Sequence, residues 1–116
     1  MEDQEMRPDD DLGLKGRALK LADMVRYQQG AVVSRTVVDR KVGTVTLFAF
    51  DKGQGLSEHT APYDALVHVF DGEALVTIAG NEVWVQAGEM VIMPANHPHS
   101  LHASTAFKMV LVMIRS

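Results

Sequence analysis

The amino-acid sequence predicts an all-β domain, built as an antiparallel sandwich or barrel and preceded by a short helix. Its length of 116 residues suits one domain, and a hydrophobic content of 47% is enough for a packed core. After Gly30, short runs rich in valine and threonine alternate with turn signals such as Asp71-Gly72 and Gly80-Asn81. Short strands repeated in this way are typical of two-layered antiparallel folds.

The N-terminal part of the chain is expected to lie outside this domain. Residues 1–16 hold six acidic and two basic side chains, a charge of −4, whereas residues 17–116 hold nine of each and are neutral. We therefore expect an acidic flexible tail over residues 1–16 and a single folded domain over residues 17–116. Apolar residues recur at helical spacing from Arg17 to Arg26, which predicts a short amphipathic helix that ends before Gly30.

Eight strands are expected after this helix, each rich in β-branched or other apolar residues and bounded by turn signals. Their ranges are 31–39, 42–50, 65–70, 73–79, 82–86, 89–93, 99–103 and 107–114. The strands at 65–70 and 107–114 are apolar on both faces, so the outer face of their sheet should be covered as well. Either the N-terminal segment or a second subunit could cover it, and at this size a homodimer is the simpler explanation.

Composition excludes several classes of function. The chain has no cysteine, so it forms neither disulfides nor thiolate metal sites. Its longest apolar run, Met109 to Ile114, is far shorter than the roughly 20 residues of a membrane helix. The acidic start has no leader-like apolar segment, which makes the cytoplasm the expected compartment. No basic stripe is present to neutralise phosphates, so we expect neither nucleic-acid nor membrane partners.

Two segments carry the strongest functional signal, one between Gly53 and Gly72 and the other between Gly88 and His99. Their order of glycine, proline and histidine resembles the paired motifs of the cupin family, G-x5-H-x-H-x3,4-E-x6-G and G-x5-P-x-G-x2-H-x3-N. The resemblance implies an antiparallel jelly-roll β-barrel, the double-stranded β-helix. It also implies an interior divalent metal held by three imidazoles and one carboxylate, with positions left open for substrate.

The implied ligand set is incomplete in this chain. His59 matches the first histidine of motif one and His99 the histidine of motif two, but alanines stand at the second histidine (Ala61) and at the carboxylate (Ala65). In motif two, the glycine is replaced by Asn96 and the final asparagine by Ala103. A divalent metal such as iron, manganese, nickel or zinc is therefore expected on His59 and His99, and a pocket without metal is the alternative.

Neighbouring side chains are candidates to complete the site. His97 lies two residues before His99, which puts both on one side of an extended segment unless Pro98 turns the backbone, so His97 is the candidate third ligand. Strand parity places His68 and Trp84 on the outer surface. The residues expected to line the substrate pocket are Tyr63, Asp64 and Met93.

Methionines are frequent near the second motif and at the C-terminus. Met90, Met93, Met109 and Met113 are expected to be adaptable filling of the barrel interior. The alternative to this packing role is a copper site with methionine thioethers as ligands, although no Met-x-Met spacing supports it.

Two hypotheses of function follow from the resemblance and the altered ligand set. The first is metal-dependent chemistry of the oxygenase, isomerase or decarboxylase type on a small organic molecule held inside the barrel. The second is a metal-free cupin that binds or senses a small molecule mainly by apolar burial.

Overall fold

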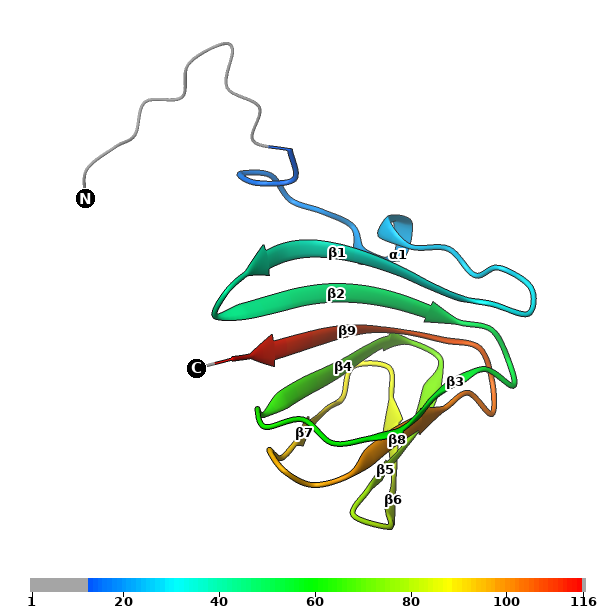
Figure 1. The fold of residues 1–116 in the computed structure, drawn as a ribbon. Helices are drawn as coiled ribbons and strands as arrows, with labels where there is room; N and C mark the ends of the chain where they lie inside the picture. Colours follow the sequence, from blue (N-terminus) through cyan, green and yellow to red (C-terminus); the bar gives the residue numbers. More distant parts are fainter. Residues whose placement is uncertain (1–12, 116) are drawn as a thin grey trace.

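The structure, a computed structural model, describes residues 13–115 and consists of two facing antiparallel sheets (Figure 1). The larger sheet has the strand order β1-β2-β9-β4-β7 and the smaller one β3-β8-β5-β6. The larger sheet is formed by β1 (Val32–Arg40), β2 (Gly43–Phe50), β9 (Phe107–Ile114), β4 (Ala65–Asp71) and β7 (Met90–Met93). The smaller sheet is formed by β3 (Gly55–His59), β8 (His99–His102), β5 (Glu73–Ile78) and β6 (Asn81–Gln86). The predicted all-β class is confirmed.

All eight predicted strands are present, each with ends within one residue of the expected ones. The additional strand is β3, which lies outside the eight predicted ranges. Its residues are mostly exposed and include a glycine and three charged or polar side chains, so propensity does not indicate a strand. Pairing with β8 makes it one, and two further backbone hydrogen bonds anchor its start: Gly53 N to Ala103 O at 2.7 Å and Ala103 N to Gln54 O at 2.8 Å.

The predicted short N-terminal helix is present, but it is shorter than the expected range 17–26. The structure has only a single turn, α1 (Leu21–Met24), and the N-cap residue Lys20 makes no capping hydrogen bond with its side chain. Val25 is already extended and is 4% exposed, because it packs against Leu47 and Ala49 on the outer face of the larger sheet. A helix this short depends on tertiary contacts, and here the sheet favours an extended continuation.

The N-terminal segment covers part of the outer face of the larger sheet. Leu21 and Met24 join Val25 in an apolar cluster with side chains of β1, β2, β4 and β9. The buried Lys108 on β9 donates a hydrogen bond from Nζ to the carbonyl oxygen of Ala22 at 3.1 Å. One of the two explanations for doubly apolar strands, cover by the N-terminal segment, therefore holds over this half of the face. Residues 1–12 of the predicted tail lie outside the described residues.

The main core lies between the two sheets. Phe50 and Phe107 stack at the centre with ring centroids 4.5 Å apart, surrounded by fully buried valines such as Val67, Val69 and Val76. The burial of Val67, Val69 and Phe107 shows which face of β4 and β9 points inward. Because side chains alternate along a strand, every second residue of these two strands lies on the inner face, which also lines the pocket described below. No helix in the described part of the chain is long and apolar enough to cross a membrane.

Candidate metal centre

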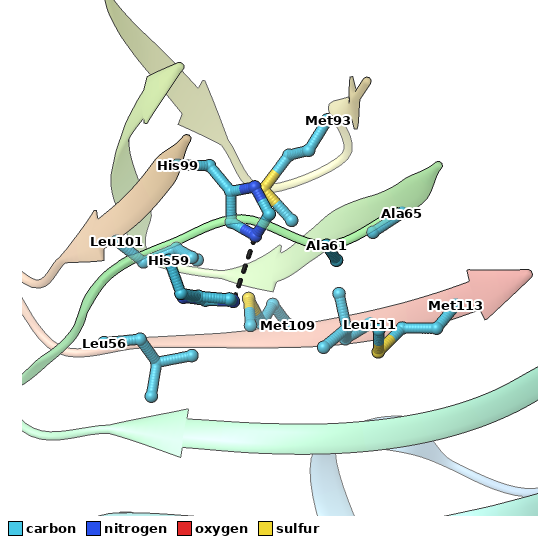
Figure 2. A pocket seen from close by; sticks show the side chains of 10 residues that line it. All are labelled: Leu56, His59, Ala61, Ala65, Met93, His99, Leu101, Met109, Leu111 and Met113. Atoms are coloured by element: carbon cyan, nitrogen blue, oxygen red, sulfur yellow. Dashed lines mark hydrogen bonds between the residues drawn. The ribbon is translucent and has the colours of Figure 1, made fainter. Parts of the chain in front are cut away.

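His59 and His99 meet at one end of the barrel interior (Figure 2). They are direct cross-strand partners at the end of β3 and the start of β8, so the two imidazoles start from neighbouring backbone positions. Their Nε2 atoms are 3.0 Å apart, and the rings stand nearly perpendicular, with an interplanar angle of 73°. The structure thus brings together the two histidines that match the family motifs.

The hydrogen bonds on the far side of each ring decide which nitrogen carries a proton. Nδ1 of His59 is 2.9 Å from the carbonyl oxygen of Ser57, and Nδ1 of His99 is 3.3 Å from that of His97. A carbonyl oxygen can only accept, so both Nδ1 atoms must be donors. In the neutral form, each ring then has an unprotonated Nε2, and the two lone pairs point at one another.

Burial keeps His99 in this neutral form. The side chain of His99 is 4% exposed, and loss of hydration, with a smaller contribution from the nearby His59, lowers its pKa below the ordinary value of 6.5. The hydrogen bond to the His97 carbonyl opposes this shift only in part. His59 is more exposed and stands at the mouth of the pocket. At neutral pH His99 therefore offers a lone pair as a ligand.

The 3.0 Å contact is a hydrogen bond when one Nε2 atom carries a proton, and the same separation also fits a metal ion that lies beside both nitrogens. Metal–imidazole bonds of about 2.0–2.1 Å at angles of 90–110° place two nitrogens about 2.8–3.4 Å apart. The 3.0 Å Nε2–Nε2 distance lies within that range. The carbonyl partners of Nδ1 have the role that outer hydrogen bonds have in metal sites, since they fix the tautomer and the orientation of the ligand ring.

Apart from these histidines, the pocket is lined by apolar side chains. They are Leu56, Ala61, Ala65, Met93, Leu101, Met109, Leu111 and Met113. The cavity volume is about 30 Å³, room for two or three water molecules at ~10–15 Å³ each.

Among residues 13–115 no group of three or more histidine and carboxylate side chains is placed to hold a metal. Ala61 and Ala65, at the positions of the missing ligands, face this pocket, so the losses are real vacancies in the donor set.

Of the other four predicted site residues, Met93, His97, Tyr63 and Asp64, one lines the pocket with the two histidines. Met93 lines this pocket. His97 is exposed and its Nδ1 lies 3.0 Å from the carbonyl oxygen of Ala95, while Tyr63 and Asp64 are also absent from the lining. Asp64 has a structural contact instead, because its Oδ1 accepts a hydrogen bond from Ala95 N at 2.8 Å.

The two motif loops are tied together behind the histidines. Besides the Asp64–Ala95 contact, Asn96 N donates to the carbonyl oxygen of Ala61 at 2.7 Å. Asn96 has a φ of 65°, a left-handed conformation that asparagine tolerates better than most residues. This conformation explains why a glycine is typical at this position of the motif and why asparagine can replace it.

Strand parity explains which methionines reach the pocket. Met93, Met109 and Met113 point inward, but Met90 is 54% exposed on the outer face, so its prediction as interior filling is wrong. Met90 and Met93 are three residues apart in one strand, and an odd separation puts them on opposite faces. Trp84 is exposed on the outer surface, as predicted.

Sequence reasoning missed the apolar lining contributed by β3 and β8, namely Leu56 and Leu101. These two are direct cross-strand partners, and both point into the pocket. The alternation of β8 indicates the position of Leu101, since it lies two residues after His99. Leu56 is not identifiable in this way, because β3 itself was not recognised as a strand.

Comparison with known proteins agrees with this geometry. The sequence model of the cupin domain matches residues 46–115, more than half of the chain, and the chain therefore belongs to the cupin family. With that family the two facing sheets are a jelly-roll barrel, as predicted. A search of curated protein sequences finds no match.

Several solved structures are similar. A conserved protein of unknown function from Streptococcus pyogenes has 38% identity and a TM-score of 0.83, covering 87% of this chain and 89% of that chain. A cupin 2 conserved barrel domain protein from Leptotrichia buccalis has 39% identity and a TM-score of 0.80, covering 83% of this chain and 47% of that chain. The salicylate 1,2-dioxygenase from Pseudoaminobacter salicylatoxidans has 18% identity and a TM-score of 0.66, covering 72% of this chain and 25% of that chain, a likeness of fold alone.

Proposed function

We propose that this cupin holds a transition-metal ion between Nε2 of His59 and Nε2 of His99 and acts through it on a small molecule. One observation carries the proposal. Both Nδ1 atoms face carbonyl oxygens, so two unprotonated Nε2 atoms face each other at a separation of 3.0 Å. Two such lone pairs repel unless both bind a proton or a metal ion, and their separation suits two bonds to one metal ion that lies beside both nitrogens.

The protein residues around the site have three separate tasks. The carbonyl groups of Ser57 and His97 keep the rings oriented. The apolar lining keeps bulk water out, while Ala61 leaves room beside the pair for a further ligand. A metal bound there would supply Lewis-acid activation or electron transfer to a small molecule.

The size of the cavity argues against a metal-free binding protein. Pockets that hold drug-sized ligands have volumes of ~300–1,000 Å³. The interior here has about 30 Å³, enough for an ion with one or two waters but not for an organic ligand held by burial. A substrate would therefore approach at the mouth, beside the exposed His59.

The composition of the lining favours one reaction type over the others. Among the described residues that line the pocket, the two imidazoles are the only ionisable groups, and both would be ligands. In isomerisation and decarboxylation a side chain commonly moves protons, and this lining offers none for that role. Oxygenase-type chemistry, in which the metal activates the reactants, is the reaction class we propose.

The test is a direct measurement of metal binding. Protein purified without an affinity tag is stripped with chelator and titrated with Mn(II), Fe(II), Ni(II), Zn(II) and, without oxygen, Cu(I). We expect one ion per chain for at least one of these metals by elemental analysis. If none of them binds more tightly than about 1 mM, the proposed function is wrong.

We also propose that two copies pair through the uncovered half of the larger sheet. Ile92, Leu66 and Val112 form one row across the outer face of β7, β4 and β9. Ile92 and Ile114 are each 55% exposed there, beyond the reach of the N-terminal segment. Exposed apolar side chains gathered on one face are typical of subunit interfaces.

Sedimentation analysis of Ile92→Lys tests this pairing. We expect the unmodified protein to sediment as a dimer, and the variant to dissociate at least about 10-fold more readily, because a buried charge opposes the contact. Trp84→Lys is the matched control, since Trp84 is 49% exposed on the other sheet and should leave the dimer intact. A monomeric unmodified protein at about 100 µM would contradict the proposal.

A further inference from the structure

We infer that the thioethers of Met93 and Met109 complete the donor set and make the site selective for a soft ion, monovalent copper. The inference rests on the proposed function, since it presumes an ion at His59 and His99. It goes further because it names the metal class and assigns ligands that the family motifs do not contain.

Cross-strand register places methionine beside the lost carboxylate. Ala65 stands at the carboxylate position of the motif, and its partner on β7 is Met93 while its partner on β9 is Met113. The small alanine therefore has a long thioether side chain on each side, pointing to the same face of the sheet. A third inward methionine, Met109, lies four residues before Met113 on the same strand.

Burial and direction single out two of these methionines. Met93 is 2% exposed and Met109 is fully buried, and both line the pocket with the histidines. In Figure 2 their sulfur atoms point toward the imidazole pair, whereas the sulfur of Met113 lies farther along β9. Methionine is unbranched and has three rotatable bonds, so modest rotamer changes can bring sulfur to an ion.

The chemistry of the donors selects the ion. Manganese and magnesium prefer oxygen ligands, and no carboxylate, hydroxyl or amide side chain lines this pocket. Imidazole nitrogen with thioether sulfur is a donor set suited to Cu(I). An apolar enclosure also favours an ion of low charge, because the cost of removing an ion from water rises steeply with its charge.

The competing explanation is that the methionines only fill space. Replacement by leucine separates the two roles, since Leu and Met have similar volumes and such exchanges usually cost less than about 1.5 kcal/mol. The double variant Met93→Leu/Met109→Leu therefore keeps the packing and removes both sulfurs. Met90→Leu is the matched control, because Met90 lies on the same strand as Met93 but is 54% exposed on the outer face.

The experiment compares Cu(I) with Zn(II) in the full chain. Anaerobic Cu(I) titration against a chromogenic chelator should show at least about 10-fold weaker binding in the double variant, the scale of losing a supporting partner in a metal site. Zn(II) affinity should change less than about threefold, because zinc depends on the imidazoles. X-ray absorption of the Cu(I)-loaded unmodified protein should show a sulfur ligand at about 2.3 Å from copper. This copper–sulfur signal should be absent from the double variant and retained in Met90→Leu.

The outcomes separate this inference from the proposed function. Copper bound through nitrogen alone in the unmodified protein, with equal affinity in the double variant, would overturn the thioether inference and leave the histidine site intact. Failure of every metal to bind would overturn both. If the double variant does not fold, the sulfur signal of the unmodified protein decides the question by itself.

Discussion

Replacing His59 or His99 with alanine is expected to weaken metal binding by at least about 100-fold. Each variant leaves a single imidazole, and loss of even an outer hydrogen-bonding partner costs ~10–100-fold in metal affinity. His59→Ala is the cleaner variant because the side chain is exposed at the pocket mouth and its removal leaves the core intact. Isothermal titration with the metal that binds the unmodified protein measures the effect.

His97→Ala and His102→Ala are the matched controls. Both histidines are exposed, flank His99 at a separation of two or three residues, and are absent from the pocket lining. Metal affinity should stay within about threefold of the unmodified value in both, since neither side chain is a ligand. If His97→Ala weakens binding as much as His59→Ala does, the two-imidazole description is wrong and His97 is a ligand, as its spacing from His99 predicts.

Gly72→Ala is expected to destabilise the fold by about 3–5 kcal/mol, a large part of the stability of a domain this size. Gly72 connects β4 and β5 with a φ of 75°. A Cβ atom there would lie 2.2 Å from the carbonyl oxygen of Ala106 and 2.9 Å from Cα of Phe107. Both neighbours are backbone atoms of the segment entering β9, so relief of the collision requires movement of the sheet.

Gly80→Ala separates this collision from the conformational cost of a positive φ. Gly80 has a φ of 83°, close to that of Gly72, but nothing lies within 4 Å of the Cβ position. Its substitution should therefore cost only the ~1–2 kcal/mol of placing an L-residue in the left-handed region. Urea unfolding of both variants measures the difference, and equal losses of stability would show that the contact with β9 has no effect.

Much of the fold could be predicted because strand patterning reflects burial. The two-sided apolar strands β4 and β9 indicate a covered outer face, and Val25 with its neighbours provides part of that cover. The helix is shorter than its periodicity predicts. Periodicity alone cannot show that Val25 is more stable when it packs on the sheet in an extended conformation than when it continues the helix. β3 was missed because its pairing with β8 decides its conformation, and pairing is not encoded in local propensity.

The candidate site could be predicted only in part. The motif spacing identified His59 and His99, and the jelly-roll framework does bring them together. The direction of the rings depends on hydrogen bonds from Nδ1 to backbone carbonyls, which no residue pattern reveals. Asp64 was expected in the pocket, but it lies in the loop before β4 and bonds to the backbone of Ala95.

The separation of the paired imidazoles along the chain has a consequence for folding. His59 and His99 are 40 positions apart in the sequence, and β8 must insert between β3 and β5 before the rings can meet. Local hairpins such as β1–β2 and β5–β6 can form much earlier, because they close short loops. The two imidazoles therefore come together only once the barrel has closed. An ion that binds them binds the native state and not the unfolded chain, so it shifts the unfolding equilibrium toward the native state.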